Sequence, residues 1–292
     1  MKVGFIGLGI MGEPMCYNII RKHDDEVYIF DVNPERVLLV EKQGGIPCTC
    51  SREVGEKADV IITMVPRSEH SLSVYKELKE VMDDTKICID MSTIDPGVSL
   101  EIYEMLKSRG TPFLDAPVVK SQAAARLGNI GIYVGGDYEV YQSVKPVLKY
   151  MGRSIIHMGE HGKGLVMKIC HNAVTAQVQN AVNETLNLAV SQGIDMDRYG
   201  AALSYGNAQN SYFDTKQAAI KNRDYTTAFS VENMEKDINI CLNFANQHNF
   251  RMKGLEVVRN IYETAMEKGM GAIDFSSTIE VVAEDMKKSD RN

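Results

Sequence analysis

The sequence predicts an α/β fold, in which an N-terminal doubly wound sheet is followed by an all-α C-terminal domain. Short β-rich runs alternate with helical patterns in the first half of the chain. A glycine-rich turn joins the first β-rich run to the first helical pattern. After Gly164 only long apolar-periodic segments follow. We therefore expect two domains, residues 1–162 and residues 163–292.

Changes in hydrophobic periodicity locate the elements of both domains. The expected strands are 2–6, 26–30, 59–65, 86–90, 112–114, 130–136 and 154–159. The expected helices between them are 11–22, 34–43, 68–82 and 97–108. Strands that alternate with helices in this way form a parallel sheet with crossover helices. In the second domain the pattern predicts helices at 165–193, 197–209, 231–248 and 252–268.

Composition and charge exclude several classes of protein. The hydrophobic content of 44% and the charged content of 24% are typical of a soluble globular protein. A net charge of -7, without runs of Lys or Arg, argues against nucleic acid or an anionic membrane as partner. The apolar N-terminal stretch is short and broken by glycines, so we expect neither a signal peptide nor a membrane span. We expect a cytoplasmic protein.

The cysteines and histidines give no sign of a metal site. The six cysteines lack CxxC spacing, and we expect reduced residues rather than a disulfide framework. Cys48 and Cys50 supply only two ligands, which is fewer than a zinc site needs. The six histidines are scattered along the chain. We therefore expect no metal.

The motif "GLGIMG" carries the first chemistry. Gly7, Gly9 and Gly12 follow an apolar strand and open a helix. Glycines at this spacing allow a tight turn and let the backbone approach a pyrophosphate at the helix N-terminus. Because strand, turn, helix and second strand follow in order, the sequence predicts a Rossmann-type dinucleotide-binding domain at the N-terminus.

Asp31, at the end of the second expected strand, predicts which dinucleotide is bound. A carboxylate there accepts hydrogen bonds from both hydroxyls of the adenosine ribose and repels a 2′-phosphate, which favours NAD over NADP. Asp31 could instead cap the helix that follows, but Asn33, directly before Pro34, is the better cap.

A lysine in an apolar helix is the second feature that needs a reason. Lys168, Asn172, Thr175 and Gln179 recur at helical spacing and form one polar stripe on an otherwise apolar segment. A lysine near the start of a helix can extend to solvent, and this is the alternative explanation. Because the stripe continues beyond the helix start and lies where the two domains join, we expect it to face a ligand in a cleft.

The sequence also resembles a known family. The segments "GLGIMGEPM", "ADVIITMVP", "IDMSTIDP", "DAPV", "GNIGIYVGG", "GKGLVMKICHN", "MEKDI" and "GMGAIDFSS" are similar, in this order, to motifs of the β-hydroxyacid dehydrogenases. This group includes 3-hydroxyisobutyrate dehydrogenase and tartronate semialdehyde reductase. The resemblance spans nearly the whole chain and implies NAD(P)-dependent interconversion of a small β-hydroxyacid and its aldehyde or ketone.

The resemblance also assigns residues to roles. It makes Lys168 the catalytic lysine and Asn172 its companion, and it places Lys236 near the nicotinamide. The positions that it places at the cofactor are Gly7, Gly9, Ile10, Met11, Gly12, Asp31, Met64, Val65, Pro66, Thr93 and Lys236. The positions that it places at the substrate are Ser92, Val119, Lys120, Ser121 and Asn172. Without the resemblance, Met64 and Val65 would be interpreted as core residues. Homodimers or homotetramers are usual in the family.

The expected chemistry explains these residue types. Hydride transfer from an alcohol carbon requires the hydroxyl proton to leave. A lysine made less basic by burial and by a neighbouring cation, for which Lys236 is a candidate, can take that proton and return it in reduction. Asn172 can bond the reacting oxygen or hold the lysine, whereas a carboxylate there would make the lysine more basic.

One loop departs from the family pattern. After "DAPV" the family usually has Ser-Gly-Gly, but this chain has Val119, Lys120 and Ser121. A similar replacement occurs in relatives that reduce sulfolactaldehyde, where the loop binds a sulfonate. We therefore expect Lys120 and Ser121 to bind a strongly anionic end of the substrate, either a sulfonate or a second carboxylate. A solvent-facing lysine is the alternative.

Two other functions fit the same fold. A relative that reduces imines usually lacks the lysine, so the presence of Lys168 argues against it. A dinucleotide-binding module without activity would be expected to lose Lys168 or Asn172, and both are present. We therefore expect an NAD-dependent dehydrogenase or aldehyde reductase that acts on a small anionic substrate.

Overall fold

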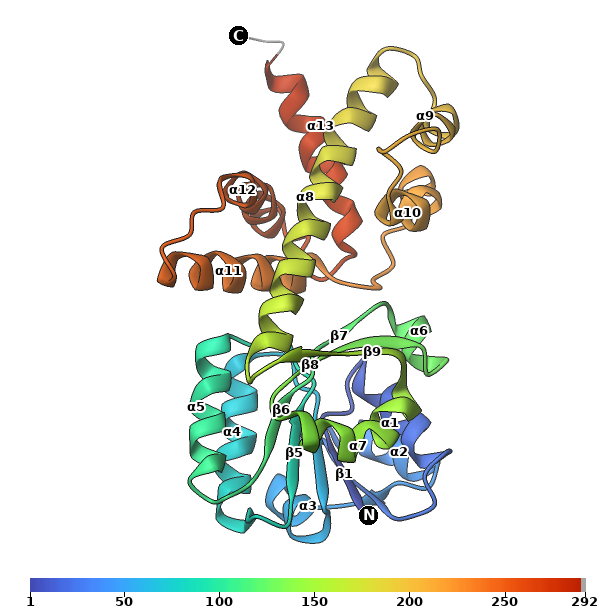
Figure 1. The fold of residues 1–292 in the computed structure, drawn as a ribbon. Helices are drawn as coiled ribbons and strands as arrows, with labels where there is room; N and C mark the ends of the chain where they lie inside the picture. Colours follow the sequence, from blue (N-terminus) through green and yellow to red (C-terminus); the bar gives the residue numbers. More distant parts are fainter. Residues whose placement is uncertain (290–292) are drawn as a thin grey trace. The chain divides into compact units, whose positions relative to one another are not determined.

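The computed structural model describes residues 1–289. The chain folds as two compact units, Met1–Lys168 and a second that starts at Ile169. The first is a sheet covered by helices, and the second is helical, as the colours from blue to red in Figure 1 show. The predicted fold class is confirmed. The change from one unit to the next falls inside a single helix, α8, Lys163–Ser191.

The strands of the first unit form one sheet. They are β1 Val3–Ile6, β2 Val27–Phe30, β3 Ile46–Pro47, β4 Val60–Thr63, β5 Ile87–Asp90, β6 Phe113–Asp115, β7 Val118–Val119, β8 Ile130–Gly135 and β9 Gly152–Gly159. Their order is β3-β2-β1-β4-β5-β6-β8-β7, and β9 pairs with β8. Strands β1 to β6 run parallel, while β8 runs antiparallel to β6. The strand order reverses between β1 and β4, and ligands of such sheets bind at this point.

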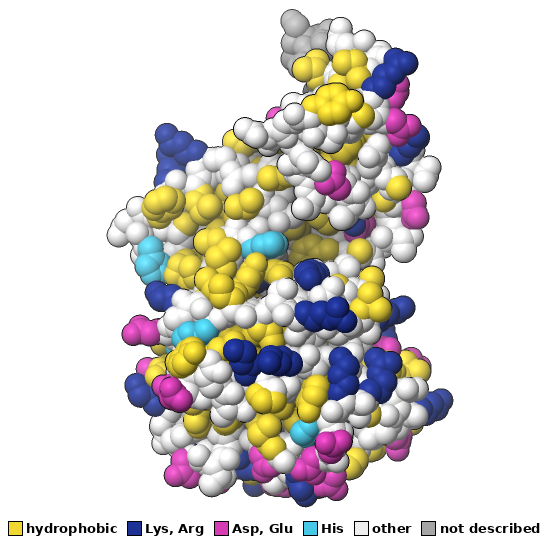
Figure 2. Space-filling view, turned by 45° about the vertical axis from the view of Figure 1, so that its right-hand side comes forward, with side chains coloured by type: hydrophobic (Ala, Val, Ile, Leu, Met, Phe, Trp, Pro, Cys, Tyr) yellow, Lys and Arg dark blue, Asp and Glu magenta, His cyan; other side chains and the backbone are white. Residues whose placement is uncertain are grey.

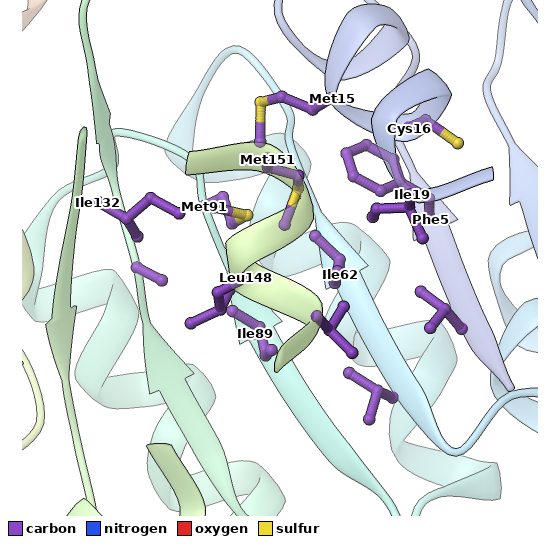
Figure 3. Close-up of a cluster of buried hydrophobic side chains, with 14 of the residues drawn as sticks. Phe5, Met15, Cys16, Ile19, Ile62, Ile89, Met91, Ile132, Leu148 and Met151 are labelled. Carbon is purple, nitrogen blue, oxygen red and sulfur yellow. The ribbon is translucent and has the colours of Figure 1, made fainter. Parts of the chain in front are cut away.

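Helices cover both faces of the sheet. They are α1 Gly12–Ile20, α2 Pro34–Glu41, α3 Ser51–Lys57, α4 Ser68–Leu78, α5 Pro96–Lys107, α6 Gln122–Arg126 and α7 Tyr138–Met151, with a 3-10 turn at Lys79–Val81. On one face Phe5 and Ile62 pack with Met15 of α1 and Met151 of α7, as Figure 3 shows. Helices α3, α4 and α5 supply the apolar core on the other face. A parallel sheet buried on both faces explains why its strands are almost wholly apolar.

The second unit has a core of its own. Its helices after α8 are α9 Met196–Leu203, α10 Ser211–Asn222, α11 Val231–Gln247, α12 Lys253–Glu267 and α13 Thr278–Ser289, with a 3-10 turn at Phe275–Ser277. Apolar side chains from α8, α10, α11 and α12 form one cluster. Among the described residues, no helix is long and apolar enough to cross a membrane, and all six cysteines are free.

Several elements escape the periodicity argument for physical reasons. Strands β3 and β7 have two residues each, and α3 and α6 are short helices without an apolar stripe of useful length. Helix α7 has a regular apolar face, but Pro146 lies inside it, and proline normally ends a helix. The expected helix at 197–209 ends at Leu203, and α10 follows as a separate helix. As expected, the Asn33 side chain caps α2 by accepting the Glu35 N–H.

An ion pair between Lys216 and Asp274 joins α10 to the segment before the 3-10 turn. Asp274 lies before the 3-10 turn with its side chain 2% exposed, and its two oxygens lie 2.8 and 2.9 Å from Lys216 Nζ. The same carboxylate accepts the N–H groups of Ala228, Phe229 and Ser276. Burial raises the pKa of Asp274, but the bonds from Lys216 and Ser276 outweigh it and hold this pKa below its ordinary value. The ionised carboxylate therefore stabilises the fold.

We expect Asp274→Asn to lower the free energy of unfolding by about 3 to 5 kcal/mol at pH 7, because the partly buried Lys216 and three backbone N–H groups lose the charged carboxylate. Because the folded-state pKa is depressed, the contribution is present above the unfolded value of 3.8 and is lost as pH falls through the folded value. Thermal unfolding of the wild type and of Asp274→Asn, from neutral pH to about pH 3, measures how the difference in stability changes with pH. Asp195→Asn, at the exposed cap of α9, is the control and should change little. A Tm difference for Asp274→Asn that is independent of pH would contradict the account.

Candidate active site

The glycine-rich turn between β1 and α1 is tightly packed on one side and open on the other. Gly7 has φ +95°, and a Cβ there would lie 2.3 Å from the carbonyl oxygen of Met64. A Cβ on Gly12 would lie 1.9 Å from the Gly7 oxygen. At Gly9 a Cβ would meet nothing within 4 Å. The first and third glycines therefore close the turn, whereas the second leaves open space beside the start of α1, which fits a dinucleotide pyrophosphate.

The loops after β4 and β5 flank this turn. The Met64 N–H donates to the Ile6 oxygen at 2.9 Å, which extends the pairing of β4 with β1. The Val65 N–H donates to Ser92 Oγ at 2.9 Å, so the predicted cofactor segment 64–66 is bonded to the segment that contains Ser92 and Thr93. These predicted residues therefore gather at the β1/β4 end of the sheet.

Sequence reasoning missed Asp90, which supports this arrangement. Asp90 is buried at the end of β5, accepts the Ser92 N–H at 2.9 Å and bonds the Ser71 hydroxyl of α4. Burial raises the pKa of Asp90 above its ordinary value. The signal available in the sequence was a carboxylate at the end of an apolar strand.

Asp31 makes two hydrogen bonds to the backbone that the sequence did not predict. One carboxylate oxygen accepts the Leu8 N–H at 2.6 Å, and the other accepts the Asn33 N–H at 2.7 Å. Asp31 therefore ties the glycine-rich turn to the end of β2. A carboxylate offers about four acceptor positions, so ribose hydroxyls can share it with these two donors.

Helix α8 carries the predicted lysine and asparagine. Lys168 is 7% exposed and Asn172 is 5% exposed. Side chains four residues apart on a helix lie on one face, with Cβ atoms about 5–6 Å apart. The rest of the predicted stripe serves a different purpose, because Gln179 donates to the Phe275 oxygen at 2.5 Å and to Thr278 Oγ1 at 2.8 Å within the helical core. Thr175 donates to the His171 carbonyl of its own helix.

Helix α11 supplies a carboxylate that the sequence argument did not use. Asn172 Nδ2 donates to Asp237 Oδ2 at 2.5 Å, and Lys236 Nζ lies 3.0 Å from Asp237 Oδ1. Asp237 is 1% exposed. Its charge holds the amide of Asn172 on one side and the ammonium of Lys236 on the other. Asp237 directly follows Lys236 in "MEKDI", so the family motif contained this signal.

The departing loop keeps the backbone shape of a glycine. Val119 ends β7, and Lys120 has φ +82°, in the left-handed region that favours glycine. The exposed Lys120 side chain donates from Nζ to the carbonyl oxygen of Asn129 at 2.9 Å. Ser121 caps α6 by position, but its side chain makes no capping bond. Lys120 therefore adds a charged side chain at the position of the family glycine but keeps the left-handed backbone conformation that glycine favours.

The residues of each unit are of types suited to proton and hydride transfer. The first unit has a turn suited to a pyrophosphate, and α8 carries a buried amine with an amide one turn further on. Over residues 1–289, no three His, Cys, Asp or Glu side chains lie close enough to hold a metal ion. A buried amine near a hydrogen-bonding amide can exchange a proton with a substrate hydroxyl.

Comparison with known proteins agrees with this chemistry. Residues 2–159 match the model of the NAD binding domain of 6-phosphogluconate dehydrogenase. Residues 162–282 match the model described as NAD-binding of NADP-dependent 3-hydroxyisobutyrate dehydrogenase.

Individual relatives match over nearly the whole chain. Mitochondrial 3-hydroxyisobutyrate dehydrogenase of Rattus norvegicus is 32% identical, over 97% of this chain and 87% of that one. 2-(Hydroxymethyl)glutarate dehydrogenase of Eubacterium barkeri is 28% identical, over 96% and 94%. The structure of Mycobacterium tuberculosis 3-hydroxyisobutyrate dehydrogenase with L-serine superposes with a TM-score of 0.90 at 27% identity, over 96% and 98%. The resemblance seen in the sequence motifs is confirmed. The chain belongs to the β-hydroxyacid dehydrogenase family and is a 3-hydroxyisobutyrate dehydrogenase-like oxidoreductase that acts on CH–OH groups with NAD(P).

Proposed function

We propose that this enzyme interconverts a small β-hydroxyacid, similar to 3-hydroxyisobutyrate, and its semialdehyde, with NAD as cofactor and Lys168 as general acid and base. The observation that carries the proposal is the buried lysine on α8 with Asn172 one turn further along the same face. A buried lysine side chain is uncommon in proteins, and a catalytic task is one reason for it. Proton transfer to a substrate hydroxyl is the task that family membership supports.

The residues around Asn172 support a fixed role for its amide. Because Asp237 accepts a hydrogen bond from Nδ2, the carboxylate decides which way the amide is turned. Bound NAD⁺ would supply the acceptor for the hydride that leaves the alcohol carbon. Lys168 takes the hydroxyl proton in oxidation and returns it in reduction, and the oriented amide of Asn172 holds the reacting oxygen or the lysine.

The choice of NAD rests on Asp31. Both oxygens of Asp31 accept backbone N–H groups, so the carboxylate is held in a fixed place beside the glycine-rich turn. A 2′-phosphate at this position would meet a fixed negative charge and would lose a ribose hydrogen bond.

We therefore expect NADH to be preferred over NADPH by at least ~1.5 kcal/mol, or about tenfold in kcat/KM. The test uses the wild-type enzyme, because substitution of Asp31 would also release the Leu8 and Asn33 N–H groups. Steady-state kinetics with the two cofactors and one aldehyde measure the ratio. Equal kcat/KM for NADH and NADPH would show that Asp31 does not select the cofactor.

The departing loop supports a second class of substrate, a sulfonated or dicarboxylic semialdehyde. Lys120 replaces a glycine in the segment where the family binds its substrate, and it keeps the backbone conformation of that glycine. Its bonds to the carbonyl oxygen and to Oδ1 of Asn129 leave one of three N–H donors, so the ammonium can also bond an anion. Such a contact adds charge-assisted bonds that a glycine cannot make.

A panel of small aldehydes with NADH tests the proposed function. The panel contains methylmalonate semialdehyde, succinate semialdehyde, tartronate semialdehyde and sulfolactaldehyde, with the uncharged aldehyde of matching length for each acid. We expect NADH to be consumed with at least one of the acids and far more slowly with its uncharged counterpart. NADH binding without turnover of any acid would instead favour a binding module without activity.

We also propose that the enzyme is a homodimer or homotetramer joined through its helical unit. On α8, Cys170, Val174, Ala181 and Leu188 recur on one face and are exposed, while the opposite face is in the core. An exposed apolar stripe of this kind often marks a surface that another protein covers. Figure 2 shows apolar side chains at the surface among the polar ones on one face of the molecule. A second copy is the occupant that the family supports, and a monomeric mass in solution would contradict the proposal.

For the compartment we propose the cytoplasm. Six free thiols fit a reducing environment. The rat relative is named as a mitochondrial enzyme.

A further inference from the structure

The start of α8 is anchored to the sheet by one side chain. The first N–H groups of a helix have no partner inside it. Here Asp115, the last residue of β6, accepts the Gly162 N–H at Oδ1, 2.7 Å, and the Leu165 N–H at Oδ2, 2.8 Å. Asp115 is fully buried. A side chain that is distant in sequence therefore caps the helix that carries Lys168.

Two glycines allow this close approach. A Cβ on Gly135 of β8 would lie 2.4 Å from Asp115 Oδ1. A Cβ on Gly164 would lie 2.8 Å from Asp115 Oδ2 and 2.4 Å from the Tyr133 carbonyl oxygen. Real Cβ atoms do not approach other atoms so closely. The first turn of α8 and the strands therefore enclose the carboxylate without spare room.

The imidazole ring of His161 lies beside Asp115. His161 Nδ1 lies 3.5 Å from Asp115 Oδ1, and the ring stacks on Tyr103 with 4.5 Å between centroids. Burial raises the pKa of Asp115 above its ordinary value, although His161 and the two N–H groups oppose this. Burial also lowers the pKa of His161, so its ring is neutral near pH 7. The two backbone N–H groups at the positive end of α8 also stabilise a charged Asp115.

The same residues do not form a hydrolytic triad. Ser99 Oγ lies 3.3 Å from His161 Nε2, so Ser99, His161 and Asp115 follow the order of a serine hydrolase site. Ser99 is fully buried in α5, however, and no substrate carbonyl can reach its hydroxyl. A structural role for Asp115 is what the geometry supports.

We propose that Asp115 is a positioning residue for Lys168, because it fixes the first turn of the helix from which the lysine projects. The inference rests on the proposed function, since it requires Lys168 to transfer the proton. Lys168 follows Leu165 by less than one turn, and each residue adds about 1.5 Å along a helix. A shift of the capped turn therefore moves the lysine by a similar distance. A displacement of about 1 Å at a reacting group can lower a rate about 10²-fold.

The test is Asp115→Asn, which keeps the size of the side chain. The amide offers one acceptor oxygen and turns an NH₂ donor toward the second backbone N–H. We expect kcat for the best acid of the panel to fall by about 10- to 100-fold, with the Kd of NADH, measured by fluorescence titration, changed less than about twofold. The matched control is Asp274→Asn, which removes another buried carboxylate that accepts backbone N–H groups, in the helical unit. It should lower Tm but not kcat. An unchanged kcat in Asp115→Asn, assayed well below its Tm, would overturn the inference.

A double variant separates a positioning role from a general loss of structure. If Asp115 acts through Lys168, Asp115→Asn combined with Lys168→Ala should be no slower than Lys168→Ala alone. Multiplied losses would show that Asp115 acts independently of the lysine and would overturn the inference. A normal kcat in Lys168→Ala would overturn the proposed function itself, whereas a normal kcat in Asp115→Asn alone would leave that function standing.

A second variant covers the case in which Asp115→Asn does not fold. Gly164→Ala keeps the carboxylate but forces the first turn of α8 away from Tyr133 and Asp115. We expect the same loss of kcat, together with faster amide hydrogen exchange at Gly162 and Leu165. Faster exchange with an unchanged kcat would show that the position of this turn does not matter for the reaction and would overturn the inference.

Discussion

Replacing Lys168 with alanine is expected to lower kcat by roughly 10² to 10⁴, while the Kd of NADH stays nearly unchanged. The reason is that the variant loses the proposed proton transfer, whereas the glycine-rich turn and Asp31, which we propose to bind the dinucleotide, are untouched. Steady-state kinetics on the best acid of the panel give kcat, and fluorescence titration gives the Kd of NADH.

Lys163→Ala is the matched control for this prediction. Lys163 is the first residue of the same helix and is exposed, so its removal changes the net charge by the same amount without removing a buried amine. We expect its kcat to be within about twofold of the wild type. If Lys168→Ala also kept the wild-type kcat, Lys168 would be a buried lysine without a part in the chemistry.

The second large effect is expected at Lys120. A charge-assisted contact contributes ~1.5–3 kcal/mol, so Lys120→Ala should lower kcat/KM by about 10- to 150-fold for the substrate with the anionic end. The loss should be far smaller for the uncharged aldehyde of the same length. Kinetics of the two proteins on the paired aldehydes give the difference.

The backbone at Lys120 decides which substitution is informative. Because φ is +82°, glycine there would relax the loop, whereas alanine keeps the same unfavourable conformation as lysine. Lys120→Ala also removes the bond to the Asn129 carbonyl, so a general change in the loop would affect both aldehydes. Lys149→Ala, at an exposed lysine of α7, controls for net charge. Equal losses on both aldehydes, or no loss on either, would mean that Lys120 does not bind the anionic end.

The sequence predicted the fold best where one signal dominated. The strands of the parallel sheet are apolar runs between helices, and the predicted helix at 231–248 matches α11, Val231–Gln247. The prediction missed elements in which two sequence signals conflicted and elements that were too short to show a periodicity. Pro146 hid the regular apolar face of α7, and β7 has only two residues. Such elements exist because tertiary pairing stabilises them, and periodicity does not report tertiary pairing.

In the candidate site, too, local features could be predicted from the sequence and long-range contacts could not. The tight turn at Gly7 and Gly12 and the place of Lys168 near the start of a helix could be predicted, because strand, turn and helix geometry are local. Asp115 could not, because its bonds to Gly162 and Leu165 join segments that are far apart in the chain. The role of Asp237 depends in the same way on the packing of α11 against α8.

The most direct test of the proposed function compares two isomeric hydroxyacids with NAD⁺. 3-Hydroxyisobutyrate has hydrogen atoms on its alcohol carbon, whereas 2-hydroxyisobutyrate has none and cannot give up a hydride. The account predicts NADH formation with the first acid, or with another β-hydroxyacid of the panel, none with the second, and loss of the signal in Lys168→Ala. NADH binding without NADH formation from any β-hydroxyacid would contradict it.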